Sequence, residues 1–194
     1  MIGPYEGEVF RLAKVLILTG DAVEALEVFY PYYRLLEEGH EVTIAAPKKK
    51  KLQTVVHDFE PHMETFTEKF AYGLDADASF EEVNPAEFDG LIIPGGRAPE
   101  HIRMHEKVPE IVTHFFTANK PVGAICHAVL VFDVVPEAVQ GREMTAFTTC
   151  RPEVERAGAK YIDKNLHVEG NLVSGHAWPD LPGFMKEFLK LLSK

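Results

Sequence analysis

The sequence predicts an α/β domain in which helices cover both faces of a mostly parallel sheet. Four short apolar runs have the length of buried strands, at 14–18, 42–46, 91–93 and 121–125. Segments with apolar residues at helical spacing separate them, at 22–39 and 108–119. Because strands alternate with helices, we expect the strands to lie parallel in one sheet. Sites in such sheets form beyond the carboxyl ends of the strands, where the strand order reverses.

Turn and breaker residues mark the ends of these elements in the first half of the chain. The turn residues Gly20-Asp21 follow the first strand, and Gly39 is a good terminator for the first helix. Pro31 lies inside that helix and is expected to bend it or disturb its hydrogen bonds locally. The segment 52–87 is the least regular part of the chain. We expect it to fold over the site or into a subunit contact.

The second half of the chain continues with shorter elements. We expect a weak strand near 144–147, a helix near 152–157, and a hairpin over 167–174. An amphipathic helix over 181–192 closes the chain.

Composition is that of an ordinary globular protein, with 46% hydrophobic and 26% charged residues in a chain of 194. We expect one domain over 14–194, preceded by an N-terminal extension over 1–13. The first residues lack the pattern of a signal peptide, and no run is long enough to span a bilayer. A cytoplasmic protein without a membrane partner is therefore expected. The net charge of −10 argues against nucleic-acid binding, because acidic surfaces repel phosphates.

Cys126 is the most informative residue, because it ends an apolar run and is followed at once by His127. The pattern predicts a strand, a sharp turn that carries the thiol, and a helix that begins at the turn, which is the geometry of a nucleophile elbow. Backbone N–H groups at a helix start would favour thiolate over thiol. The alternative is a structural cysteine packed as a small apolar side chain. Cys150 is interpreted as structural, and two cysteines predict no disulfide framework.

Carboxyl and backbone groups are expected near this thiol at the sheet edge. Glu24 and Glu27 lie three residues apart, hence on one face of the first helix. A protonated carboxyl group there would lower the pKa of the thiol by donating a hydrogen bond, and an ionised one would raise it. The alternative for both is an exposed acid at a helix start. The backbone N–H groups at Gly95-Gly96, together with that of His127, could stabilise an oxyanion beside the sulfur.

Three segments together resemble the signature segments of the DJ-1/PfpI superfamily, also described as the ThiJ/PfpI domain. They are 21–31, 94–100 and 124–127. Segments 56–59, 170–175 and 177–179 further resemble plant DJ-1 proteins with glyoxalase activity, and 95–100 also resembles archaeal PfpI intracellular peptidases. The likeness runs from about Lys14 to the end of the chain. It implies a flavodoxin-like, doubly wound fold.

Applied residue by residue, the resemblance implies a cysteine-dependent enzyme that needs no cofactor and no metal. Cys126 matches the nucleophile, Glu27 the carboxyl group at the sulfur, and His127 the histidine beside the nucleophile. Gly96 and the amide of His127 match the oxyanion hole. Glu100 matches an acid that reaches this histidine from a neighbouring subunit, so a homo-oligomer (dimer, trimer or hexamer) is expected to complete the site.

The resemblance implies glutathione-independent glyoxalase III chemistry, in which methylglyoxal or glyoxal becomes lactate or glycolate, or the related removal of early aldehyde adducts. Two alternatives remain. One is an intracellular peptidase acting on peptides, in which His127 is the base and Glu100 orients it. The other is a redox-sensing or chaperone-like stress protein in which Cys126 becomes oxidised.

Further residues are candidates for lining the substrate site. They are Glu24, His57 and His176. The family usually continues Cys-His-Gly, whereas this chain has Ala128. The added methyl group is expected to affect the width of the elbow and hence the size of the substrate.

Overall fold

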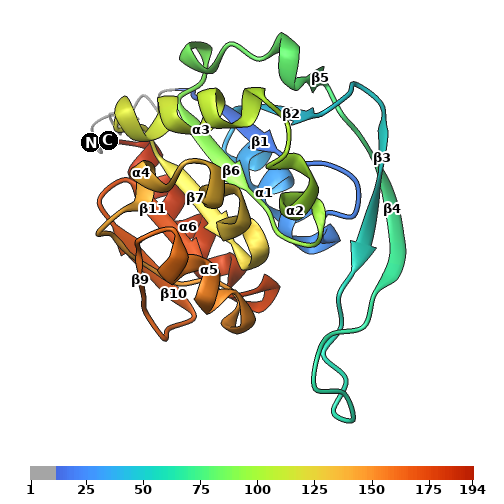
Figure 1. Ribbon diagram of the computed structural model, residues 1–194. Helices are drawn as coiled ribbons and strands as arrows, with labels where there is room; N and C mark the ends of the chain where they lie inside the picture. The colour runs from blue at the N-terminus through green and yellow to red at the C-terminus, as the bar shows by residue number, and fades with distance from the viewer. Residues whose placement is uncertain (1–11) are drawn as a thin grey trace, which may run out of the picture.

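A computed structural model describes residues 12–194 and confirms the doubly wound α/β fold (Figure 1). The central sheet has the strand order β10-β11-β7-β6-β1-β2-β5. Its strands pair in parallel except for the hairpin of β10 and β11. The strands are β1 (Lys14–Leu18), β2 (Glu41–Ala46), β5 (Ala78–Ser79), β6 (Gly90–Ile93), β7 (Val122–Ile125), β10 (Leu166–Glu169) and β11 (Leu172–Gly175). Most of the expected extension over 1–13 lies outside the described residues.

Helices cover both faces of this sheet (Figure 1). α1 and α6 pack together on one face, and α3 lies on the other with the shorter helices. The helices are α1 (Ala25–Glu37), α2 (Ala98–Ile102), α3 (Lys107–Thr117), α4 (Pro136–Val139), α5 (Arg151–Arg156) and α6 (Leu181–Leu192). Single turns of 3₁₀ helix are η1 (Phe80–Glu82), η2 (Pro85–Glu87), η4 (Thr148–Cys150) and η5 (Trp178–Asp180).

The closing helix α6 has the bounds expected from its apolar spacing, and its packing explains two glycines in the sheet. A Cβ atom on Gly123 of β7 would lie 2.7 Å from the ring of Phe184. One on Gly175 of β11 would lie 3.3 Å from the same ring. The missing side chains let the fully buried Phe184 and Phe188 of α6 rest directly on the strands. This packing holds β7, the strand that leads to Cys126, at the centre of the sheet.

The element that follows Cys126 differs from the expected α-helix. Cys126–Val134 forms a 3₁₀ helix, η3. Valines at 129, 131 and 134 are branched at Cβ, which lowers the propensity for an α-helix.

The irregular segment 52–87 contains a hairpin that the sequence analysis missed. β3 (Lys51–Val56) pairs antiparallel with β4 (Lys69–Asp75) in a separate two-stranded sheet, seen at the right of Figure 1. Most of β4 is exposed, so burial imposes no alternation of apolar and polar residues along it. The weak strand near 144–147 also differs. It is reduced to β8 (Glu143–Met144), which pairs with β9 (Lys160–Tyr161) outside the central sheet.

Candidate active site

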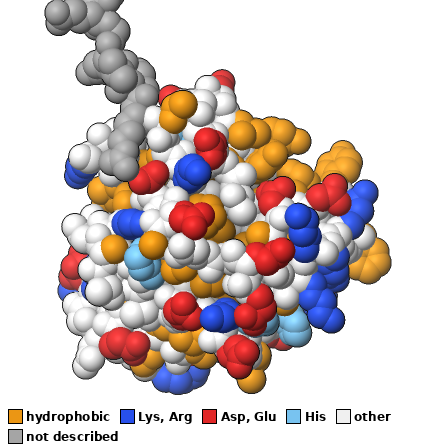
Figure 2. Space-filling view, turned by 90° about the horizontal axis from the view of Figure 1, so that it is seen from above, with side chains coloured by type: hydrophobic (Ala, Val, Ile, Leu, Met, Phe, Trp, Pro, Cys, Tyr) orange, Lys and Arg blue, Asp and Glu red, His pale blue; other side chains and the backbone are white. Residues whose placement is uncertain are grey.

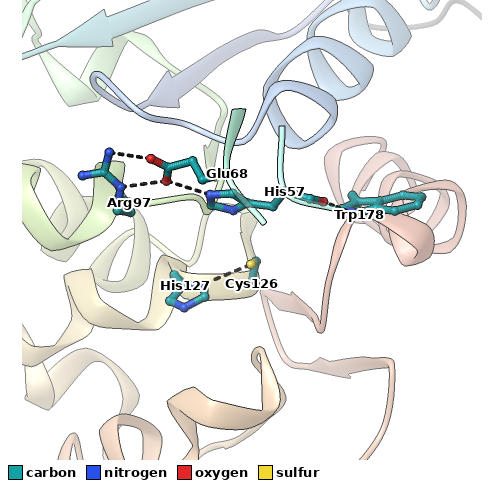
Figure 3. A network of polar contacts seen from close by, with 6 residues as sticks. All are labelled: His57, Glu68, Arg97, Cys126, His127 and Trp178. Carbon is teal, nitrogen blue, oxygen red and sulfur yellow. Dashed lines mark hydrogen bonds and ion pairs between the residues drawn. The ribbon is translucent and has the colours of Figure 1, made fainter. Parts of the chain in front are cut away.

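Cys126 lies at a sharp turn after β7, as the sequence predicts. Its φ of +62° is in the left-handed region, which costs free energy for a residue that carries a side chain. The backbone carbonyl of Cys126 accepts a hydrogen bond from the N–H of Phe147 at 3.1 Å. The side chain is 6% exposed, and Sγ lies 3.1 Å from Nδ1 of His127 (Figure 3).

Glu27 reaches the same point from α1 and is completely buried. Its Oε2 accepts a hydrogen bond from the backbone N–H of Gly95 at 2.8 Å. Its Oε1 is buried without a hydrogen bond of ordinary geometry, and Cys126 is the side chain that interacts with this carboxyl group. The expected meeting of Glu27 with the thiol is therefore present.

Gly95 brings these groups together because it lacks a side chain. A Cβ atom there would lie 2.5 Å from Oε2 of Glu27, 2.6 Å from Cβ of Cys126 and 3.0 Å from the backbone N of His127. Gly96 has a φ of +73°, and its own Cβ atom would lie 2.4 Å from the carbonyl oxygen of Ala22. Glycine at both positions lets β6, β7 and the start of α1 meet at one sheet edge.

Backbone donors face the sulfur, as expected for an oxyanion hole. The N–H groups of Gly96 and His127 both interact favourably with a negative charge on Cys126. Donors fixed in this way by the main chain stabilise charge without having to reorient.

Burial sets the protonation of the three side chains. Burial, reinforced by the nearby Glu24, raises the pKa of Glu27 to about 8, so this carboxyl group is mostly protonated at neutral pH. Burial lowers the pKa of His127 to about 4, so its imidazole is neutral. Burial also raises the pKa of the Cys126 thiol, more than the backbone donors lower it. Burial thus favours the neutral thiol, in the direction opposite to the effect expected from a helix start.

Aromatic side chains cover His127. Two of them, Phe59 and Phe66, come from the loop 57–67 between β3 and β4, which we call the roof. The ring of Phe66 meets the His127 ring edge to face at 5.7 Å between centroids, and Phe147 stacks on His127 at 5.2 Å. Phe59 stacks on Phe147 and on Trp178, each at 6.1 Å. Of the two placements expected for segment 52–87, over the site or in a subunit contact, the structure shows the first.

The sequence and fold of this chain are similar to those of known proteins. A model of the DJ-1/PfpI family matches residues 13–191. The chain belongs to the DJ-1/PfpI family. It is 41% identical over 179 residues to a Pyrococcus furiosus protein named Deglycase PfpI, covering 92% of this chain and 99% of that one.

Longer proteins contain similar domains. Protein DJ-1 homolog D of Arabidopsis thaliana is 37% identical over 92% of this chain, which spans 47% of that protein. A two-domain protein from Anabaena variabilis with DJ-1/ThiJ/PfpI-like and ferritin-like domains has a TM-score of 0.78 and 29% identity. The match covers 92% of this chain and 47% of the Anabaena chain. These likenesses support the DJ-1/PfpI fold assignment.

The three residues expected to line the substrate site, Glu24, His57 and His176, have different surroundings in the structure. Glu24 is buried and not an exposed helix-start acid. It caps α1 by accepting a hydrogen bond from the N–H of Glu27 at 2.8 Å, and burial raises its pKa to about 7. His57 is 3% exposed and belongs to the roof. Nε2 of His176 lies 2.9 Å from Oγ1 of Thr148, and its ring lies 5.2 Å from that of Phe147.

Other expected residues do not join the thiol within one chain. Glu100 is exposed on α2, and its charge acts on His127 of the same chain, but none of the hydrogen bonds described for residues 12–194 joins the two side chains. Asp21, in the turn after β1, holds the start of the hairpin. It pairs with Lys50 and accepts a hydrogen bond from the N–H of Gln53 at 3.0 Å. Ala128 is buried in the core below the elbow.

Four residues of the site were not predicted from the sequence: Glu68, Arg97, Phe66 and Phe147. Nε and Nη2 of Arg97 each donate a hydrogen bond to Glu68 at 2.7 Å, and Glu68 also contacts His57 (Figure 3). Arg97 follows the Gly-Gly pair directly, which is the one signal that could have indicated it. Within residues 12–194, no cluster of three His, Cys, Asp or Glu side chains could hold a metal ion, and no helix could span a bilayer.

Proposed function

We propose that this protein converts methylglyoxal and glyoxal to lactate and glycolate without glutathione, or reverses the early adducts that such aldehydes form on amines and thiols. The observation that carries the proposal is the position of Sγ of Cys126 at 3.1 Å from Nδ1 of His127, beside the buried carboxyl group of Glu27. Such a site holds both a nucleophile and the proton carriers that the reaction needs. The deglycase name of the Pyrococcus relative supports this reaction class.

The first step is addition of the thiol to the aldehyde. Sγ of Cys126 bonds to the aldehyde carbon, and the thiol proton passes through Nδ1 of His127 to the aldehyde oxygen, which gives a hemithioacetal. Transfer during attack fits the raised pKa of the thiol, because no free thiolate has to accumulate. The N–H groups of Gly96 and His127 stabilise the charge that develops on the oxygen.

The second step moves two protons within the bound substrate. One passes from the former aldehyde carbon to its carbonyl neighbour, and one from the first oxygen to the second, with Glu27 and His127 as carriers. The first carbon is thereby oxidised to a thioester and the second is reduced to an alcohol, so no external oxidant or reductant is needed. Water then cleaves the thioester, releases the hydroxy acid and returns the proton to Cys126.

The roof over the thiol favours a small carbonyl compound over a polypeptide. Cys126 is 6% exposed, and aromatic rings cover the adjacent His127. The peptidase alternative requires an extended chain to enter this space, so we place it second. Selective oxidation of Cys126 requires an accessible thiolate, which the raised pKa of the thiol disfavours, so a redox-sensing role is placed third.

We further propose that the protein works as a homo-oligomer in which Glu100 of one chain approaches His127 of another. The exposed position of Glu100 leaves it free to do so. An apolar strip supports association, because Phe70 and Tyr72 of β4 are 82% and 78% exposed, and Tyr33 of α1 is also exposed nearby. Figure 2 shows apolar and basic side chains together at its right-hand edge, the side on which the hairpin lies in Figure 1.

The experiment that tests the proposed reaction measures lactate formed from methylglyoxal without glutathione. Wild-type protein should form lactate, Cys126→Ala should form none, and Glu27→Gln should lose on the order of a hundredfold or more in kcat, as expected for a lost proton carrier. Equal turnover by all three proteins would rule out the proposal. A fluorogenic peptide assayed in parallel tests the peptidase alternative.

A further inference from the structure

Glu68 connects two parts of the site that are far apart in the sequence. One carboxylate oxygen accepts a hydrogen bond from Nε of Arg97 at 2.7 Å and lies 3.0 Å from Nε2 of His57. The other accepts a hydrogen bond from Nη2 of Arg97 at 2.7 Å. Figure 3 shows the three side chains in one row above Cys126 and His127. Two parallel bonds to a guanidinium group make a directional, charge-assisted contact.

The two partners of Glu68, Arg97 and His57, lie on different sides of the site. Arg97 directly follows Gly96, whose backbone N–H faces the sulfur. His57 begins segment 57–67, which forms the roof. The backbone of His57 is held separately, since its carbonyl oxygen accepts a hydrogen bond from Nε1 of Trp178 at 3.0 Å.

His57 links Glu68 to the aromatic rings over the site, because it contacts both Glu68 and Phe66. Its imidazole is 3% exposed and lies 4.2 Å from the ring of Phe66, measured between centroids. Phe66 in turn meets His127 at 5.7 Å and Phe147 at 5.6 Å. A buried imidazole without Glu68 would lose its polar partner, which disfavours the closed arrangement.

We infer that Glu68 is a positioning residue that holds segment 57–67 closed over Cys126 and thereby restricts the site to small carbonyl compounds. The substrate class in this inference rests on the proposed function, whereas the closure itself does not. Glu68 acts through Arg97 and His57 and has no part in the chemical steps. Arg97, and secondarily His57, lowers the pKa of Glu68 to about 2, so the contact is intact throughout the neutral range.

Alkylation of Cys126 by reagents of two sizes tests the closure without relying on catalysis. Iodoacetamide is the small reagent, and a maleimide on a long polyethylene glycol chain is the large one, with adducts at Cys126 counted by peptide mass spectrometry. Glu68→Ala should raise the rate with the large reagent by about five- to tenfold and change the rate with iodoacetamide by less than about twofold. An unchanged rate with the large reagent, or equal acceleration of both, would overturn the inference.

Glu64→Ala is the matched control, because Glu64 is an exposed acid on the same segment that makes no hydrogen bond or ion pair within residues 12–194. It should behave as the wild type with both reagents. Arg97→Ala should reproduce the effect of Glu68→Ala, and the double variant should add nothing further, because both changes break the same contact. Additive effects of the two changes would contradict a shared contact.

Steady-state kinetics then test the link to substrate size. The ratio of kcat/KM for phenylglyoxal to that for methylglyoxal should rise by about fivefold in Glu68→Ala, mainly through a lower KM for phenylglyoxal. An unchanged ratio would refute the restriction on substrate size. If the wild type turns over neither compound, the proposed function fails, while the alkylation rates still decide whether Glu68 closes the roof.

Discussion

The carboxyl group of Glu27 accepts a hydrogen bond from the backbone N–H of Gly95, 2.8 Å away, across the edge of the sheet. This bond ties the first turn of α1 to the loop after β6, at the point where Cys126 leaves β7. Glu27 is completely buried there, which is unusual for an acid and raises its pKa to about 8. The burial of this carboxyl group keeps it mostly protonated at neutral pH.

The stability of the protein should fall as pH rises toward the pKa of Glu27. The native protein binds this proton up to about pH 8, whereas an unfolded chain releases it near the ordinary value of 4.5, so the free energy of unfolding decreases across that interval. Glu24 contributes in the same direction up to about pH 7. Urea unfolding between about pH 7 and 8.5 should therefore show a loss in the wild type that Glu27→Gln lacks. Parallel pH profiles for the two proteins would contradict a protonated Glu27.

The reactivity of Cys126 should keep increasing with pH beyond the range of an ordinary thiol. Burial, and next the Glu27 charge, raise the pKa of Cys126 above its usual value of 9.0, and alkylation requires the thiolate. Iodoacetamide should therefore still react faster at about pH 9.5 than at about pH 8.5. Glu27→Gln removes the repelling charge and should accelerate alkylation at the higher pH. A rate that reaches its plateau near neutral pH would show that the resting group is a thiolate.

Replacement of Gly95 should disable the site while the fold persists. A Cβ atom at this position would lie 2.5 Å from Oε2 of Glu27 and 2.6 Å from Cβ of Cys126. Gly95→Ala should destabilise the protein by about 1–3 kcal/mol and abolish turnover, because the backbone around the thiol has to move. Gly73→Ala is the control, since its closest contacts are with the flexible side chain of Lys51 in the exposed hairpin. Thermal unfolding and the methylglyoxal assay would be measured on both variants.

Glu100 should matter to catalysis through its charge near His127, and more strongly if a second chain completes the site. Glu100→Gln should lower kcat by about tenfold or more without changing the oligomer size measured by light scattering, because the residue is exposed and supports no core packing. Phe70→Ser combined with Tyr72→Ser should reduce the oligomer size if the apolar strip is the interface. Full activity of Glu100→Gln would indicate that each chain carries a complete site.

The fold could be predicted from local patterns to a large extent. β1 and α6 have the bounds that their apolar spacing indicates, and the strand before Cys126 was expected within one residue of β7. These elements bury continuous apolar stretches, so their signal lies in neighbouring residues. The hairpin of β3 and β4 was missed, because most of β4 is exposed and carries no such signal.

The sequence by itself determined the architecture, the elbow at Cys126, and the presence of Glu27 and Gly95 beside it. Only the tertiary structure decided that burial raises the pKa of Cys126 and of Glu27, and that Glu68 contacts both Arg97 and His57. The physical reason is that desolvation depends on everything packed around a group. The groups that bury Cys126 and Glu27 come from α1, from the loops after β6 and β7, and from segment 57–68. These segments are far apart in the sequence, so no local pattern predicts that they meet.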